Sequence, residues 1–210
     1  MNQPATINLA VLISGSGTTL QNLIDTIASG RLNARISVVV ASRPEIAGID
    51  RATTAGLPHH VVDRRVLTDI DAFSERVFAH CIEAEADLIC LGGWLSLLQI
   101  PQRFDGRIMN VHPALLPSFG GKGMYGANVH RAVLDHGCKL SGCTVHFVDQ
   151  TYDNGPIILQ RTCPVLEGDT PESLAHRVFE EEKIAYPQAI DLFGQGRLSI
   201  DGRCVRSAPK

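Results

Sequence analysis

The chain has 210 residues, of which 44% are hydrophobic and 20% charged, and its formal net charge is −3 at pH 7. These are ordinary values for a single globular domain that is large enough to bury a full core. A slightly acidic chain gives no electrostatic reason to expect nucleic acid or a membrane surface as a partner, and no apolar run is long enough to span a bilayer. The N-terminus lacks a basic segment followed by an apolar one, so we expect no signal peptide and a cytoplasmic location.

The residues that commonly bind metals are not grouped in the sequence. Six cysteines are present and none belongs to a CxxC pair, so we expect reduced thiols and no zinc site. His59 and His60 are adjacent, but no carboxylate or further histidine follows at a suggestive spacing. We interpret them as residues at a strand end and predict no metal.

The N-terminal stretch combines an apolar run with a glycine turn. Residues 7–13 predict a strand that is covered on both faces, and apolar residues then recur at helical spacing from Leu20 to Ile27. The turn between them, residues 14–19, is an anion cradle because free N–H groups and the helix dipole both point at it. It has neither the lysine of a Walker motif nor the third glycine of a dinucleotide fingerprint, which favours a phosphate-bearing substrate over ATP or NAD. A plain glycine turn fits this pattern equally well.

Strands and helices are then predicted to alternate along the first half of the chain. We expect strands at 36–40, 59–62, 87–91 and 107–111, and helices at 46–55 and 69–85. This alternation predicts a parallel sheet, whose binding sites lie beyond the carboxyl ends of the strands. The glycine turn, residues 92–94 after the fourth strand, and residues 110–112 on the fifth would then share one edge.

The remainder of the chain changes character. We predict a helix at 128–136, then strands at 139–149 and 157–162 that are joined by a loop and could pair antiparallel at the sheet edge. Thr170 and Pro171 have the residue types of a helix N-cap and first position, and the long helix that they open is expected to break at Pro187 and resume to Phe193.

Two further segments carry turn signals. Residues 197–205 predict a terminal hairpin with an Asp-Gly turn. Residues 120–126 contain four glycines and predict a mobile loop, either a substrate lid or a connector. The fold class is therefore α/β, with a mostly parallel twisted sheet, helices on both faces, and antiparallel edge strands in the C-terminal half.

Asn110 and His112 stand two residues apart in an extended segment, so their side chains point to the same face. An amide donor beside a titratable ring suits a site where an oxygen gains negative charge and a proton must move. From these two residues alone, a turn-capping asparagine and a hydrogen-bonded core histidine are the commoner interpretation.

Three motifs together resemble one family. They are ISGSGTTLQ at 13–21, NVHPALLP at 110–117, and GCTVHFV at 142–148 followed by DNGPII at 153–158. Their order and spacing resemble glycinamide ribonucleotide transformylase (phosphoribosylglycinamide formyltransferase), within the folate-dependent formyltransferase superfamily. The resemblance covers nearly the whole chain. It implies one Rossmann-like formyltransferase domain over 1–210, with a phosphate-binding half at 1–106 and a catalytic and folate-binding half at 107–210.

The resemblance implies transfer of the formyl group of 10-formyltetrahydrofolate to the amine of phosphoribosylglycinamide in de novo purine biosynthesis. That family uses no metal and no covalent enzyme intermediate. It implies that Asn110 and His112 stabilise the oxyanion of a tetrahedral intermediate. Asp153 would keep His112 protonated, since a nearby carboxylate raises an imidazole pKa, and a water near Asp153 would relay the proton. The partners would be the two small-molecule substrates, with the protein a monomer or a homodimer.

The resemblance also assigns binding residues. Gly17, Thr18 and Thr19 match the phosphate-binding turn, and Glu182 matches a glutamate that contacts the ribose hydroxyls. The positions that match the folate pocket are Leu91, Trp94, Leu95, Ser96, Leu97, Leu98, Asn110 and Val148.

The chain departs from the family pattern at several positions. Many members carry arginine where this chain has Ser96 and Ile70, so the glutamate tail of the folate is expected to be held differently. Ala114 replaces a frequent serine, and Ser16 and Thr19 stand where asparagine is common, a change that a cradle of backbone amides should tolerate.

Three other functions compete with this interpretation. A formyltetrahydrofolate hydrolase shares the Asn, His and Asp set, but normally has an additional N-terminal regulatory domain for which we expect no room here. A methionyl-tRNA formyltransferase needs a basic C-terminal domain, which we also do not expect. A folate- or nucleotide-binding protein without turnover would not need Asn110, His112 and Asp153 together.

Overall fold

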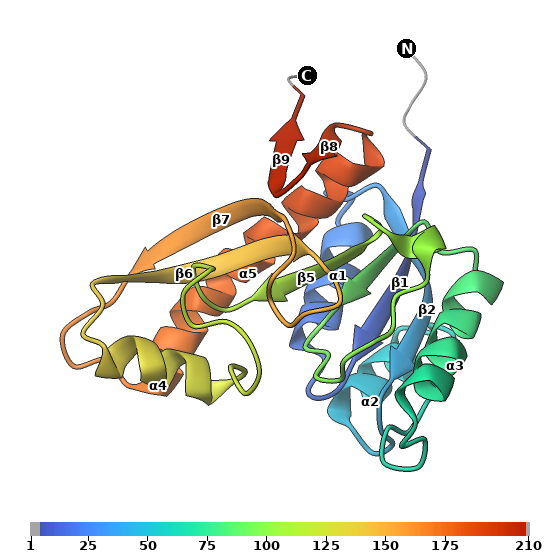
Figure 1. The fold of residues 1–210 in the computed structure, drawn as a ribbon, viewed down its shortest axis with the longest axis horizontal. Helices are drawn as coiled ribbons and strands as arrows, with labels where there is room; N and C mark the ends of the chain where they lie inside the picture. The colour runs from blue at the N-terminus through green and yellow to red at the C-terminus, as the bar shows by residue number, and fades with distance from the viewer. Residues whose placement is uncertain (1–4, 209–210) are drawn as a thin grey trace. The chain divides into compact units, whose positions relative to one another are not determined.

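The computed structural model describes residues 5–208, which fall into two compact units divided between Met109 and Asn110 (Figure 1). The first unit contains four strands and three α-helices in alternation. They are β1 (Ile7–Ile13), α1 (Thr18–Ala28), β2 (Ala34–Ala41), α2 (Ala47–Thr54), β3 (His59–Val61), α3 (Ile70–Glu83) and β4 (Leu88–Leu91), followed by a short 3-10 helix, η1 (Gln102–Phe104).

The strands of the first unit lie in the order β3-β2-β1-β4, and each neighbouring pair is parallel. β1 is central: Val11 lies opposite Val39 of β2 on one side and Cys90 of β4 on the other. All five of its residues from Leu9 to Ile13 are fully buried. Such a run is apolar without alternation because both faces of a parallel strand are covered.

The second unit is built around antiparallel pairs. Its elements are β5 (Ile108–His112, which spans the division), α4 (Ala127–Asp135), β6 (Leu140–Phe147), β7 (Ile157–Pro164), α5 (Pro171–Gly194), β8 (Leu198–Asp201) and β9 (Cys204–Ser207). The strand order is β5-β6-β7-β9-β8, with β6/β7 and β8/β9 antiparallel. The predicted combination of parallel strands with antiparallel strands in the C-terminal half is confirmed.

α5 packs on β6 and β7 and shows one error in the sequence prediction. The helix does not break at Pro187 but runs without interruption from Pro171 to Gly194. A proline inside a helix removes one backbone hydrogen bond and costs about 3 kcal/mol. Ala185, Tyr186 and Ala189 around it are fully buried. Burial of this face offsets that cost, so the helix continues through Pro187.

The terminal hairpin is present, but its loop differs from the prediction by one residue. Asp201 pairs with Cys204, so the two loop residues are Gly202 and Arg203 rather than Asp201 and Gly202. Gly202 has a φ of +59°, the left-handed conformation that glycine adopts at least cost. The shift leaves Arg203 at the tip of the hairpin.

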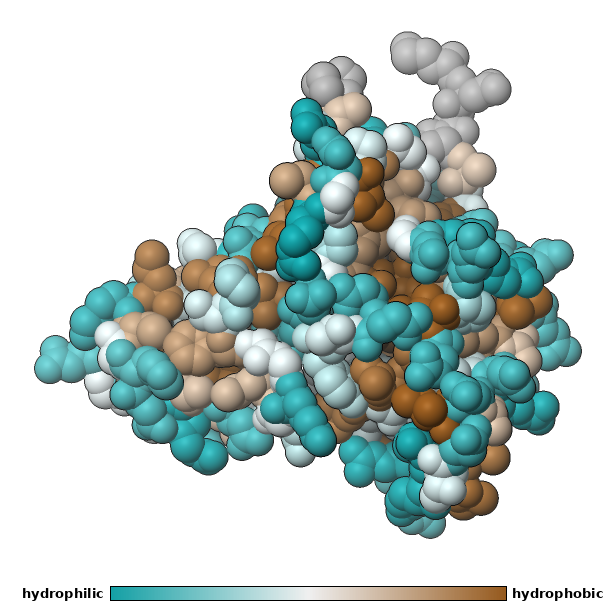
Figure 2. Space-filling model, viewed as in Figure 1, coloured by the Kyte–Doolittle hydropathy of each residue, from teal (hydrophilic) through white to brown (hydrophobic). Residues whose placement is uncertain are grey.

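The glycine-dense segment 120–126 has defined contacts. The Met124 N–H donates to the Gly121 carbonyl at 3.0 Å, and Asn128 Nδ2 donates to the Gly123 carbonyl at 3.2 Å. The segment leads into α4, whose Val129 and Val133 are buried, while Figure 2 shows mostly hydrophilic residues around this helix in the view drawn. A lid function for this segment stays a prediction.

Candidate active site

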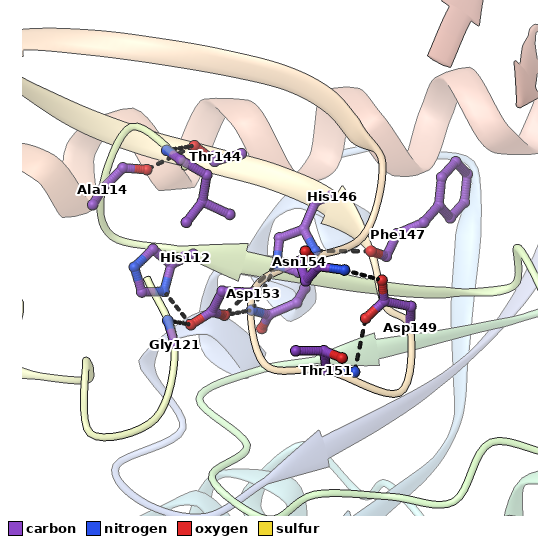
Figure 3. A network of polar contacts seen from close by, with 12 residues as sticks. His112, Ala114, Gly121, Thr144, His146, Phe147, Asp149, Thr151, Asp153 and Asn154 are labelled. Atoms are coloured by element: carbon purple, nitrogen blue, oxygen red, sulfur yellow. Dashed lines mark hydrogen bonds and ion pairs between the residues drawn. The ribbon is translucent and has the colours of Figure 1, made fainter. Parts of the chain in front are cut away.

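His112 on β5 faces Asp153, as Figure 3 shows, and Asn110 of the same strand also contacts this acid. His112 Nδ1 lies 3.4 Å from Asp153 Oδ2, and Asn110 Nδ2 donates to Asp153 Oδ1 across 3.4 Å. Asp153 belongs to the loop between β6 and β7, so distant parts of the sequence meet here. The prediction that the two β5 side chains share one face is confirmed, and the same acid binds both.

His112 is only 3% exposed, and each of its ring nitrogens faces an acceptor. Nε2 lies 2.8 Å from the Phe119 carbonyl oxygen, and Nδ1 faces the Asp153 carboxylate. Two acceptors suit an imidazolium, since both nitrogens then carry a proton.

Burial and the neighbouring acid act on the pKa of His112 in opposite directions. Burial lowers the pKa of His112, and the Asp153 charge and the Phe119 carbonyl only partly offset that effect. Asp153 thus acts on the His112 pKa in the expected direction, but burial outweighs it in the ligand-free protein. Here the free-energy cost of removing the charged ring from water is larger than the stabilisation that one nearby carboxylate provides.

Asp153 is held as a carboxylate in spite of its surroundings. Its side chain is 11% exposed, and its backbone has a φ of +52°, which is uncommon outside glycine. The Gly121 N–H donates to Oδ2 at 2.9 Å. Burial alone would raise the pKa of Asp153, but the neighbouring His146 and His112 rings and the Gly121 N–H together lower it.

His146 is a member of this cluster that the sequence analysis did not assign. It lies on β6, is 1% exposed, and places Nε2 at 3.2 Å from Asn110 Nδ2 and 3.8 Å from Asp153 Oδ1. Its Nδ1 lies 2.8 Å from the Phe147 carbonyl oxygen. With the proton on Nδ1, Nε2 accepts from Asn110 and orients that amide. The signal available in the sequence was a histidine within a predicted strand that contains β-branched residues.

The predicted phosphate turn has the geometry of an open helix start. Gly17 is the N-cap of α1 with a φ of +70°, and no side chain caps the helix, so its leading N–H groups are available to an anion. A Cβ on Gly17 would lie 2.6 Å from the Gly48 Cα at the start of α2. Arg51 Nε donates to the Ser16 carbonyl at 2.9 Å and holds the turn from outside.

The segment after β4 meets that turn at one edge of the first unit. The Leu95 N–H donates to Ser14 Oγ at 3.1 Å, and Ser42 Oγ donates to the same oxygen at 2.7 Å. Ser14 directly follows β1, so two of the three predicted site segments are brought together. Of the predicted folate residues here, Leu91, Trp94 and Leu98 are buried, Ser96 and Leu97 are half-buried, and Leu95 is 40% exposed.

Two further predicted binding residues belong to the second unit. Glu182 is on α5, where burial raises its pKa to about 8 although its residue surface is partly exposed. Val148 directly follows β6 and is half-buried. Ile70, a position where many family members carry arginine, begins α3 in the first unit.

Neither a metal cluster nor a membrane-crossing helix is found in the part of the chain that the structure describes. Within residues 5–208, no group of three or more His, Cys, Asp or Glu side chains is arranged to hold a metal ion. No helix in the same range is both long and apolar enough to cross a membrane.

Residues 7–190 match the sequence family described as formyl transferase. The chain belongs to this family. The family predicted from the three motifs is thereby confirmed. Phosphoribosylglycinamide formyltransferase, chloroplastic, of Arabidopsis thaliana is 35% identical over 200 residues, which make up 94% of this chain and 68% of that protein. Trifunctional purine biosynthetic protein adenosine-3 of Bos taurus is 40% identical over 205 residues, and this chain spans 20% of its length.

Solved structures give the same result for this formyl transferase. Glycinamide ribonucleotide transformylase 1 from Symbiobacterium toebii matches with a TM-score of 0.92 at 43% identity, over 99% of this chain and 96% of that one. A formyltetrahydrofolate deformylase from Pseudomonas syringae has a TM-score of 0.84 at 21% identity, covers 96% of this chain and 66% of that one, and shares the fold alone. The predicted fold class is confirmed.

Proposed function

We propose that this formyl transferase moves the formyl group of 10-formyltetrahydrofolate to the amine of phosphoribosylglycinamide. The products are formylglycinamide ribonucleotide and tetrahydrofolate, in de novo purine biosynthesis. The observation that carries the proposal is the contact of Asp153 with both Asn110 and His112. An amide donor, an imidazole and a carboxylate in one buried cluster are the groups that amine attack on a formyl carbon requires.

The reaction begins when the amine nitrogen attacks the formyl carbon and its carbonyl electrons move onto oxygen. Asn110 Nδ2 donates to the oxyanion, which replaces its 3.4 Å bond to Asp153 while the 3.2 Å contact with His146 keeps the amide in place. His112 donates from a ring nitrogen as negative charge develops. The loss of one such donor costs about 2.7–4 kcal/mol of transition-state stabilisation in a comparable site.

Proton transfer then completes the exchange. The attacking nitrogen loses a proton, which travels through water near the Asp153 carboxylate to the folate nitrogen that leaves. The carbonyl re-forms as the bond between carbon and folate nitrogen breaks. The lowered pKa keeps Asp153 a carboxylate over the physiological range, so that it can orient the water that relays the proton. No metal is required at any step.

The binding roles extend the resemblance of these positions to the family. Gly17, Thr18 and Thr19 would hold the phosphate through backbone N–H groups at the open start of α1. Glu182 would accept from the ribose hydroxyls. For the pterin we propose, in the first unit, Leu91, Trp94, Leu95, Ser96, Leu97 and Leu98, and in the second unit Asn110 and Val148. We propose a cytoplasmic monomer or homodimer with these two small-molecule substrates as its partners.

One experiment separates this function from its competitors. Purified protein is mixed with 10-formyltetrahydrofolate, with and without phosphoribosylglycinamide, and loss of the formyl donor is followed. Consumption only when the ribonucleotide is present, with formylated product in equal amount, is expected. Consumption without the ribonucleotide would indicate a hydrolase, and no consumption in either mixture would indicate a binding protein.

A further inference from the structure

The loop that carries Asp153 is held by contacts that take no direct part in the proposed chemistry. Residues 148–156 join β6 to β7, and Asp153 sits near the far end of this loop with its left-handed φ of +52°. A non-glycine residue in this region persists only where its surroundings determine it. The contacts that hold the loop therefore also decide where the carboxylate lies.

Asp149 closes the loop from inside, as the dashed lines in Figure 3 show. Its Oδ1 accepts from the Thr151 N–H at 2.8 Å, and its Oδ2 accepts from Asn154 Nδ2 at 2.7 Å. Asn154 directly follows Asp153, so this second bond fixes the backbone on the C-terminal side of the acid. Gly155 then passes so close to the Phe147 carbonyl oxygen that a Cβ would lie 1.8 Å from it.

Arg203 supports the same loop from outside. It stands at the tip of the β8–β9 hairpin, and its Nη2 donates to the Asn154 carbonyl at 2.8 Å. The hairpin lies beyond residues 7–190, the span that matches the family. Asn154 is thus held through its side chain by Asp149 and through its carbonyl by Arg203.

We propose that Asp149, Asn154 and Arg203 are positioning residues for Asp153. They hold its carboxylate where Oδ2 meets His112 and Gly121 and where Oδ1 meets Asn110. The importance of the Asp153 carboxylate position for turnover rests on the proposed function. The effect of that position on the pKa of His112 does not. A displacement of about 1 Å in a catalytic group can cost on the order of 100-fold in rate.

A charge-balanced exchange tests the inner contact. Asn154→Asp places two carboxylates together and should lower kcat at least about tenfold, since the repulsion opens the loop. Asp149→Asn alone should stay within about threefold of wild type, because the Asn154 amide can turn over and accept. The double variant again has an amide donor at one position and a carboxylate acceptor at the other, and its net charge equals that of wild type. Its kcat should return to within about threefold of wild type.

The outer contact has a matched control on the same hairpin. Arg203→Ala should lower kcat about three- to tenfold with little change in either KM, because it frees the Asn154 carbonyl without touching a binding residue. Arg206 lies in the same exposed hairpin and pairs with Asp201 at 3.0 Å instead. Arg206→Ala should leave kcat unchanged. Asn154 and Arg203 are both exposed, so neither change removes core packing.

An NMR titration of the His112 ring separates positioning from a general loss of structure. Asp153 raises the pKa of His112, so a displaced carboxylate should lower that pKa further in Asn154→Asp and Arg203→Ala. The charge changes by themselves would act in the opposite direction, since one variant adds a negative charge and the other removes a positive one. A fall in the pKa therefore reports movement of Asp153.

The proposal is overturned if Asn154→Asp keeps wild-type kcat, if the double variant fails to recover, or if the pKa of His112 does not fall. Equal losses in Arg203→Ala and Arg206→Ala would also overturn it. If the wild-type protein transfers no formyl group, the proposed function fails, and the His112 titration still decides whether these residues position Asp153.

Discussion

The imidazole of His112 faces the carboxylate of Asp153 across 3.4 Å, while its other nitrogen faces the Phe119 carbonyl oxygen at 2.8 Å. This arrangement gives both ring protons an acceptor, yet burial keeps the pKa of the ring low in the ligand-free protein. The ring is therefore ready to gain a proton when substrate charge appears beside it. Entry of an anionic intermediate would shift the balance toward the imidazolium.

Asp153→Asn should lower kcat by about 10²–10⁴-fold, since it removes the carboxylate that handles the proton. The asparagine introduced at position 153 keeps only part of the contacts with Asn110 and Gly121. We still expect the fold to be retained. The measurement is kcat for formyl transfer, with circular dichroism to confirm folding. Near wild-type turnover in a folded variant would contradict the assignment of Asp153.

His112 should make the protein less stable in mild acid. Its pKa lies below the ordinary value of 6.5, so between those two pH values the unfolded chain binds more protons than the folded one. The free energy of unfolding should therefore fall as the pH falls through that window. His112→Gln should remove the His112 contribution to this slope, whereas His80 and His130, whose pKa values burial also lowers, still act in the same direction and Glu182 acts in the opposite one. Denaturant titrations between pH 7 and pH 5 measure this, and an unchanged slope would contradict it.

Glu182 should have the opposite effect at higher pH. Burial raises its pKa from 4.5 to about 8, so between these values the folded chain holds a proton that the unfolded chain has lost. Stability should fall as the pH rises through that window. Glu182→Gln should remove this loss and raise the KM for the ribonucleotide above pH 8, where the wild-type side chain accepts from the ribose hydroxyls as a carboxylate. Thermal unfolding at pH 5 and pH 8 checks the first effect, and steady-state kinetics checks the second.

Gly17→Val should weaken ribonucleotide binding far more than folate binding. The new Cβ would meet the Gly48 Cα at 2.6 Å, and the residue would be strained at a φ of +70°, so the open N–H groups of α1 would move. The KM for the ribonucleotide should rise at least about tenfold, because one or more charge-assisted hydrogen bonds are lost.

Gly15→Ala is the matched control for that change, because a Cβ at Gly15 has nothing within 4 Å. It should leave both KM values close to wild type. Equal losses of ribonucleotide and folate binding in Gly17→Val would argue against the phosphate cradle.

The sequence by itself determined the elements and the relation between near neighbours. The apolar run of β1, the glycine start of α1 and the capped start of α5 follow from local rules, because side-chain periodicity and caps act within a few residues. The shared orientation of Asn110 and His112 follows from strand alternation in the same way. Strand alternation alone left a structural role for these two residues as the commoner interpretation, and the site was predicted from the resemblance of three motifs to one family.

Only the tertiary structure decided what depends on burial and on distant partners. Packing keeps α5 continuous through Pro187, and β6 brings His146 beside Asn110. Desolvation, which no local pattern encodes, lowers the pKa of His112 although an acid lies next to it. The contact of Arg203 with Asn154 joins the terminal hairpin to the loop of Asp153. Contacts between residues far apart in sequence leave no periodic pattern in the sequence. They can therefore be identified only in the folded chain.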